Sequence, residues 1–182
     1  GVVAGAGLGG GGWWVGGWLW GGRGGGGVWV GGRGGGGAVD VFGTLWYDSN
    51  QLWLSDDGSG LAYTESALAW GVASTASRSQ MSCAFADFNS DGMLDLFLGT
   101  TADVNALFIN NGTVFVEEGA QRGLDQSGSS RGVSLGDFNG DGAVDVFVCQ
   151  FDEPNLLLVN NGSGVFTNRA QEYGVDTDLN SA

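Results

Sequence analysis

The sequence predicts an all-β protein built from four-stranded units that repeat along the chain, and three observations carry this prediction. The nine residues of Asp137–Asp145, DFNGDGAVD, recur fifty residues earlier at Asp87–Asp95 as DFNSDGMLD. A run of branched and aromatic residues follows each copy, which is typical of a buried strand. A second apolar run, at 105–109 and 155–159, leads into Asn-Asn-Gly at 110–112 and 160–162, which favours a tight hairpin. Repeats of this length indicate arrays or propellers.

Residues 1–37 differ from the rest, since they hold 21 of the 38 Gly and five of the eight Trp. Fixing a Gly backbone costs more entropy than fixing any other residue, so we predict a low-complexity, largely disordered lead-in. Residues 27–37 are also interpreted as a degenerate start of the first unit. No basic flank precedes the apolar part, so neither a membrane span nor a signal peptide is predicted. The first residue is Gly1 and not Met, which indicates a fragment or a processed product.

The first repeat, residues 38–79, is degenerate but keeps the register of the later ones. Asp40 aligns with Asp145, and Tyr63 aligns with Phe166. Its loop is expected at 32–40, where three Gly replace the polar residues of the other loops and only Asp40 remains; these are Gly32, Gly34 and Gly36.

Residues 80–130 and 131–182 are the two well-preserved repeats. In the later one, strands are predicted at 132–136, 144–150 and 155–159, with a fourth starting at 165 and a close at 173–175. The earlier one matches it point for point. Four short strands per repeat are typical of a β-propeller blade, and propellers close with about four to eight blades. About three repeats therefore predict blades of an incomplete ring.

The two Asp-rich loops are predicted to be calcium sites, because their oxygen donors suit a hard cation that takes six to eight oxygens. The ligands expected at positions 1, 3, 5, 7 (backbone carbonyl) and 9 are Asp87, Asn89, Asp91, Met93 and Asp95 in one loop, and Asp137, Asn139, Asp141, Ala143 and Asp145 in the other. The alternative is a solvated Asp/Asn/Gly turn. Two unit charges about 4 Å apart repel by about 4 kcal/mol at an effective dielectric near 20, which favours a bound cation. An EF-hand is excluded because position 12 is Leu98 or Val148 instead of Glu.

Composition narrows the function classes. The net charge of −14 argues against nucleic acid and anionic membrane as partners. The chain has no His, so it offers no Ser-His-Asp or Cys-His arrangement, and we predict a non-enzyme without catalytic residues. Cys83 and Cys149 are interpreted as two buried thiols, with one disulfide as the alternative. Asn111 and Asn161 start glycosylation sequons, but they also lie where a hairpin favours Asn-Gly, and the turn is the preferred interpretation.

The stretch 136–148, GDFNGDGAVDVFV, resembles the calcium loop and strand of FG-GAP/VCBS repeats, which occur in integrin α-subunit propellers. The continuation from Asn155 through 160–162 to Val175 resembles the ASPIC/UnbV group, of the cartilage acidic protein 1 type. The resemblance is strong over 80–182 and weak over 38–79. It implies a β-propeller, usually seven-bladed, with calcium loops between the first two strands of a blade. The chain departs from the family in lacking a Gly-Ala-Pro element, the acids of the first loop and the family's C-terminal domain.

Together these observations predict a calcium-binding, non-catalytic propeller segment that acts outside the cell or at its surface. Such a segment would support adhesion or binding of a protein or glycan ligand. The alternative is the accessory propeller of a secreted carbohydrate-active or other hydrolytic enzyme whose catalytic domain lies outside this chain. Three blades leave open faces, so we expect contact with further blades outside this chain or self-association, and no membrane insertion.

Overall fold

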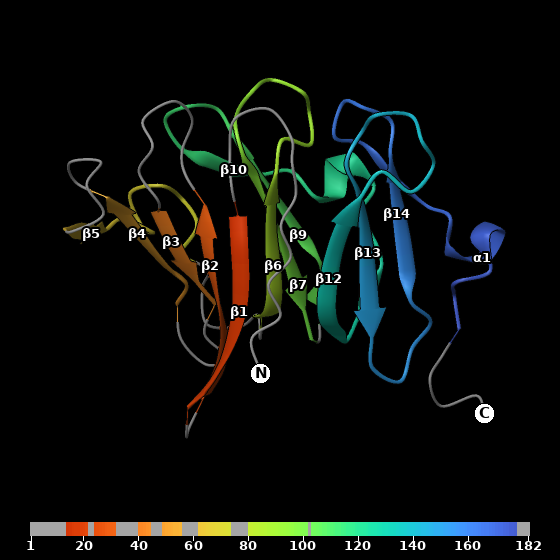
Figure 1. Ribbon diagram of the computed structural model, residues 1–182, viewed down its shortest axis with the longest axis horizontal. Helices are drawn as coiled ribbons and strands as arrows, with labels where there is room; N and C mark the ends of the chain where they lie inside the picture. Colours follow the sequence, from red (N-terminus) through yellow and green to blue (C-terminus); the bar gives the residue numbers. More distant parts are fainter. Residues whose placement is uncertain are drawn as a thin grey trace.

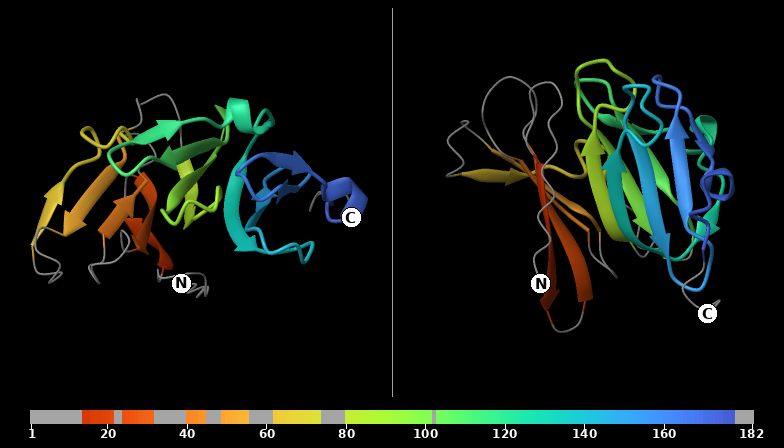
Figure 2. Two further views of the ribbon diagram at one scale, coloured as in Figure 1. Left: turned by 90° about the horizontal axis from the view of Figure 1, so that it is seen from above. Right: turned by 45° about the vertical axis from the view of Figure 1, so that its right-hand side comes forward.

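A computed structural model describes residues 14–21, 24–31, 40–44, 49–55, 62–73, 80–101 and 103–177. This part of the chain forms three antiparallel sheets of four or five strands and one two-stranded ribbon. The sheets stand side by side like the blades of a fan (Figures 1 and 2). The predicted all-β class of propeller-like blades is therefore confirmed.

The first sheet has the strand order β1-β2-β3-β4-β5. Its strands are Trp14–Gly21, Gly24–Gly31, Asp40–Gly43, Gln51–Ser55 and Tyr63–Glu65. Strand β3 begins at Asp40, just as a strand of the third blade begins at Asp145. The register predicted for the degenerate repeat is thus present. Its expected loop at Gly32, Gly34 and Gly36 lies outside the described residues.

The lead-in differs from the sequence prediction, because 14–21 and 24–31 form a β-hairpin instead of a disordered segment. The register sets large residues opposite Gly: Trp14 pairs with Gly31, Trp18 with Gly27 and Trp20 with Gly25. Strand β2 also pairs along β3, so the hairpin extends an existing sheet. Tertiary pairing thereby outweighs the low intrinsic strand preference of Gly. Residues 1–13, 22–23 and 32–39 lie outside the described part.

The second and third blades are four-stranded meanders of the same design. The second blade consists of β6 (Gln80–Ala86), β7 (Asp95–Thr100), β9 (Ala106–Asn110) and β10 (Phe115–Glu117). The third consists of β12 (Ser130–Gly136), β13 (Asp145–Gln150), β14 (Leu156–Asn160) and β15 (Phe166–Asn168). Even the register shift in the first strand recurs, at Gln80/Ser82 and at Ser130/Gly132. The strands predicted for both repeats are present.

Short elements between and after the blades were not predicted. The ribbon pairs β8 (Asp103–Val104) with β11 (Ser127–Gly128). The 3-10 helix η1 (Ala120–Arg122) follows the second blade, and the helix α1 (Ala170–Tyr173) follows the third. Each of these single turns ends at a Gly in the left-handed region, Gly123 at φ 85° and Gly174 at φ 67°, a common way to end a helix.

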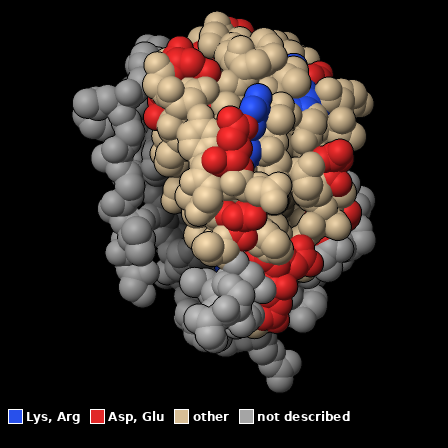
Figure 3. All heavy atoms as spheres, turned by 90° about the vertical axis from the view of Figure 1, so that its right-hand side faces the viewer, with Lys and Arg blue, Asp and Glu red and all other residues tan. Residues whose placement is uncertain are grey.

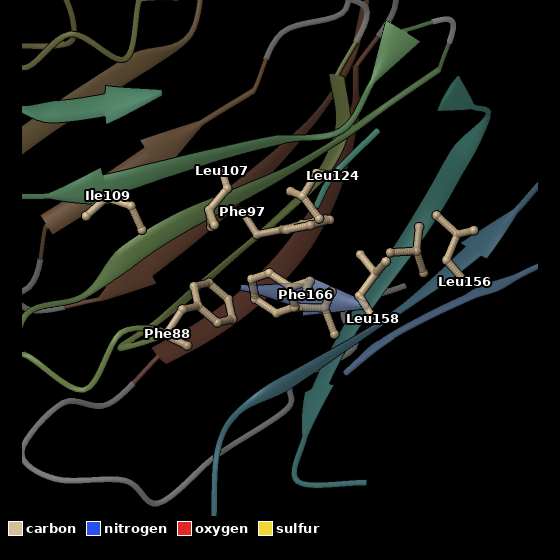
Figure 4. Close-up of a cluster of buried hydrophobic side chains, with 11 residues drawn as sticks. Phe88, Phe97, Leu107, Ile109, Leu124, Leu156, Leu158 and Phe166 are labelled. Carbon is tan, nitrogen blue, oxygen red and sulfur yellow. The ribbon is translucent and has the colours of Figure 1, made fainter. Parts of the chain in front are cut away.

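The hydrophobic core lies between the sheets. One cluster joins the second and third blades, and eight of its residues are labelled in Figure 4: Phe88, Phe97, Leu107, Ile109, Leu124, Leu156, Leu158 and Phe166. The other cluster joins the first sheet to the second blade and contains Phe42, Leu52, Val72, Leu96, Leu98, Phe108 and Phe115. The second blade is covered on both faces, so every residue of β7 is buried.

The two cysteines are both free thiols, so the structure contains no Cys83–Cys149 disulfide. Cys83 is buried, and this burial raises the pKa of its thiol well above the usual value. Cys149 is exposed, so the prediction of two buried thiols is wrong for this residue. Its strand, β13, belongs to the last sheet of the described part, and no further described sheet packs on the face where Cys149 lies. No helix in the described ranges has the length and apolar character needed to cross a membrane.

Candidate metal centre

Each candidate loop connects the first two strands of a blade, from β6 to β7 in the second-blade loop (87–95) and from β12 to β13 in the third-blade loop (137–145). The position-1 Asp organises the bend in both. Asp87 accepts backbone N–H bonds from Asp91 (3.0 Å) and Gly92 (2.9 Å). Asp137 accepts the equivalent bonds from Asp141 (3.1 Å) and Gly142 (2.9 Å). Through these bonds a single Asp side chain holds the backbone of the whole bend.

Positions 3 and 5 are linked to each other. In the second-blade loop, the Asn89 amide donates to Asp91 Oδ2 at 2.8 Å, and Asp91 Oδ1 accepts from the N–H of Met93 at 2.8 Å. The third-blade loop repeats both bonds at 2.7 and 2.8 Å. The N–H of Ala143, followed by the Asn139 amide, lowers the pKa of Asp141 and favours its ionised form.

The Asp at position 9 of each loop lies in the sheet, away from the exposed tip of the loop. The Asp95 carboxylate is fully buried and accepts the N–H of Phe88 at 3.0 Å and that of Asn110 at 2.9 Å. Asp145 makes the same two bonds, to Phe138 at 2.9 Å and to Asn160 at 2.8 Å. Burial raises the pKa of Asp95 to about 6; the two backbone bonds oppose the shift, and the charges of Asp91 and Asp87 add to it.

The degenerate first repeat shows what position 9 does without the other ligands. Asp40 Oδ1 accepts the N–H of Ser55 at 3.0 Å, which is the bond that Asn110 and Asn160 donate in the later blades. Asp40 is thus kept where the other acids of the loop are absent from the sequence. The position-9 carboxylate is therefore a structural link between the second strand and the end of the third.

Two functional residues were missed by sequence reasoning, which took Asn110 and Asn160 only as hairpin residues. Asn110 donates to the carbonyl of Leu94, and Asn160 donates to the equivalent carbonyl of Val144. Each also accepts the N–H two residues further on, at 2.9 and 3.0 Å. These side chains fasten the outer hairpin to the end of the loop. Their repetition at the same interval as the loops was the available indication.

The side chains of both loops offer oxygen donors to a metal ion. The donors at positions 1, 3 and 5 are all oxygens, and a carboxylate oxygen that accepts one N–H keeps a second lone pair. The chemistry of the donor set therefore fits Ca²⁺. Within the described residues, however, no group of three or more His, Cys, Asp or Glu side chains is gathered as a metal site. A site in these loops would have to draw on the Asn amide oxygens and backbone carbonyls as well.

Acidic side chains are spread over the face that the third blade presents, and few basic ones accompany them (Figure 3). The described ion pairs join Arg122 to Glu118 and Arg169 to Glu172.

Asn111 and Asn161 each form an Asx turn with the Thr or Ser two residues on, which supports the turn interpretation of both sequons.

The family model for the FG-GAP-like repeat matches residues 87–148 and again residues 137–182, which together span more than half of the chain. Both matched stretches begin at the position-1 Asp of a candidate loop. A comparison with curated proteins found no match.

Proposed function

Because the chain belongs to the FG-GAP-like repeat family, we propose that it is a calcium-binding, propeller-type segment of a protein that acts outside the cell or at the cell surface. The observation that carries this proposal is the duplication of one loop with the same oxygen donors and the same internal hydrogen bonds, from Asp91 to Asp87 and from Asp141 to Asp137. A solvated turn needs no such matched donor set in two places.

In this proposal Asp87, Asn89 and Asp91 supply the second-blade site, with the Met93 carbonyl and Asp95; the third-blade site uses Asp137, Asn139, Asp141, Ala143 and Asp145. A bound Ca²⁺ would supply positive charge that offsets the repulsion among the carboxylates. The chain's own hydrogen bonds hold the loop bend, while the position-9 Asp ties the loop to the hairpin at Asn110 or Asn160.

We further propose that the segment is not catalytic and supports adhesion or the binding of a protein or glycan. The absence of His and the placing of its paired Asp residues in the loops support this view. The strongly negative charge disfavours nucleic acid and anionic membranes as partners. Assignment to the ASPIC/UnbV group is part of the same proposal, and it rests on the Asn-Asn-Gly hairpin and the closing Gly174-Val175.

Calorimetry with Ca²⁺ tests the proposal. We expect two Ca²⁺ per chain, with dissociation constants from about 10⁻⁵ to 10⁻³ M, and a melting temperature that falls on addition of EDTA. Asp87→Asn and Asp137→Asn should each remove one equivalent. Glu153→Gln, which changes an exposed acid outside both loops, is the matched control and should leave both. The absence of calcium heat together with a melting curve unmoved by EDTA would refute the calcium sites.

A further inference from the structure

The cores on the two sides of the second blade are made by corresponding residues. Toward the second blade, the first sheet presents Phe42, Leu52 and Leu54. Toward the third blade, the second blade presents Phe97, Leu107 and Ile109 at the same strand positions. In the third blade these positions are Phe147, Leu157 and Val159, and no further sheet in the described part of the chain packs against them. Phe147 and Val159 are half-buried there, whereas Leu157 is buried.

Two large side chains beside these residues are exposed, whereas the equivalent side chains of the preceding sheets pack against the next blade. Phe88 is 0% exposed because the ring of Phe166 lies 5.6 Å away in a T-shaped contact. Its counterpart Phe138 is 44% exposed. Trp70 packs on Phe115 at 6.0 Å, whereas its counterpart Tyr173 is 46% exposed. We define the open third-blade face as Phe138, Phe147, Val159 and Tyr173, all of which are half-buried or exposed.

The first sheet presents the complementary kind of face on its other side. Val146, Leu158 and Phe166 of the third blade pack on the second blade, and Leu96, Phe108 and Phe115 of the second pack on the first sheet. The same positions in the first sheet are Val41, Trp53 and Tyr63. Tyr63 is 40% exposed, and Val41 and Trp53 are half-buried. These three residues define the open first-sheet face.

The close packing of one sheet against the next also recurs at the glycine that ends each repeat. A Cβ on Gly71 would lie 2.8 Å from the carbonyl oxygen of Phe115, and one on Gly123 would lie 2.2 Å from that of Phe166. In both cases the fourth strand of the next blade runs against the glycine. At Gly174, the third of the series, nothing lies within 4 Å of the added atom. This leaves space for one more fourth strand.

We propose that the open third-blade face binds the open first-sheet face of a second copy of this chain, head to tail. The partner is a second copy because the chain itself carries the matching face, with Tyr63 in the place that Phe115 and Phe166 occupy at the two existing interfaces. Phe138 then packs on the second copy's Tyr63, as Phe88 packs on Phe166. Two copies bring together six sheets, within the range of roughly four to eight that closed propellers contain. Head-to-tail contacts form a ring when the rotation closes.

This proposal does not depend on calcium binding, and assembly state tests it. Sedimentation velocity of the wild-type chain is expected to show a dimer or a larger head-to-tail assembly that grows with concentration. The double variant Phe138→Asp with Tyr173→Asp, and separately Tyr63→Asp, should each be monomeric with unchanged circular dichroism. Leu68→Asp is the control, because Leu68 is 84% exposed and lies on neither face. A wild-type chain that stays monomeric at every concentration would overturn the proposal.

Mixing the two monomeric variants distinguishes head-to-tail from face-to-face contact. Each variant keeps one face intact, so an equimolar mixture should recover assembly. If the mixture stays monomeric, or if Tyr63→Asp alone still assembles, the head-to-tail contact is refuted.

Cys149 gives a second readout, since it shares this side of β13 with Phe147. A Cβ on its second-blade counterpart, Gly99, would lie 3.0 Å from Ser130 Cβ in the next blade. Assembly should therefore slow thiol modification of Cys149, while buried Cys83 stays unreactive throughout. A modification rate that does not depend on protein concentration would contradict the contact.

Discussion

The second-blade loop and the third-blade loop have the same donors and the same internal hydrogen bonds, but different surroundings. The third blade supports the second-blade loop: Asn160 donates to the Phe88 carbonyl at 2.8 Å, and Ser90 donates to the Gly162 carbonyl at 3.3 Å. Within the described part of the chain, no such hydrogen bond from another blade reaches the third-blade loop. The sequence motif therefore determines the loop's shape, whereas the neighbouring blade determines how firmly the loop is held.

The largest expected difference between the loops concerns the aromatic residue at position 2. Phe88→Ala should lower the free energy of unfolding by about 3 to 5 kcal/mol, because it empties a buried site in the core between blades. Phe138→Ala should cost less than about 1 kcal/mol in the monomer, because this side chain is largely exposed. Urea denaturation of both variants at low protein concentration measures the difference. Equal losses would contradict the comparison.

The two hairpin asparagines should differ next. Asn160 donates to the carbonyls of Phe88 and Val144, whereas Asn110 donates to that of Leu94. Asn160 also accepts the N–H of Gly164 at 3.0 Å, a bond without a counterpart at Asn110. Asn160→Ala is therefore expected to be more destabilising than Asn110→Ala by about 1 to 3 kcal/mol, the worth of two hydrogen bonds. The same denaturation experiment provides the measurement. An equal or greater loss for Asn110→Ala would show that the additional bonds of Asn160 contribute nothing.

If both loops bind Ca²⁺ as proposed, the second-blade loop should bind more tightly, because its neighbour already restricts it. We expect a difference of up to about tenfold, which equals about 1.4 kcal/mol. Asp137→Asn leaves the second-blade site alone, and Asp87→Asn leaves the third-blade site alone, so calorimetry on each variant gives one constant. Tighter binding by the third-blade site would reverse the order predicted here.

Position 4 gives the smallest expected effects. Gly140 has φ 79°, so Gly140→Ala should cost about 1 kcal/mol through backbone strain alone. Ser90 holds φ 62° at the equivalent place and also donates to Gly162. Ser90→Gly removes the strain and loses that bond, so its net effect should stay within about 0.5 kcal/mol. Thermal melts of both variants suffice, and a large loss for Ser90→Gly would show that the hydroxyl bond matters more.

Much of the fold was predictable because its information is local. Continuous runs of branched and aromatic residues, the Asn-Gly turns at 111–112 and 161–162, and a fixed interval between loops specify the meander of each blade. The hairpin at 14–31 was missed, because its Gly-rich composition opposes order and its pairing with β3 is a tertiary effect. The ribbon of β8 and β11 was missed for a related reason, since two-residue strands leave no periodic pattern.

The candidate site was predictable in its residues and not in its organisation. The spacing of Asp87, Asn89 and Asp91 indicated the loop, yet nothing local showed that Asp95 is a fully buried link to Asn110. The survival of Asp40 in a loop without other acids was the one hint, and the structure explains it through the bond to Ser55. The contrast between Phe88 and Phe138 depends on the next blade, so identical motifs could not reveal it.

The placing of both cores between sheets, and not within them, has a consequence for the unit that folds. The sequence repeats as 80–130 and 131–182, but the cluster around Phe97 and Leu158 draws six of its eleven buried residues from the first of these repeats and five from the second. The set of residues that packs into one core is therefore shifted by half a blade relative to the sequence repeat. Cutting the chain at a repeat boundary would divide a core in two. Duplication of one repeat, in contrast, adds one complete interface with each copy, so such a chain can lengthen blade by blade more readily than it can be shortened.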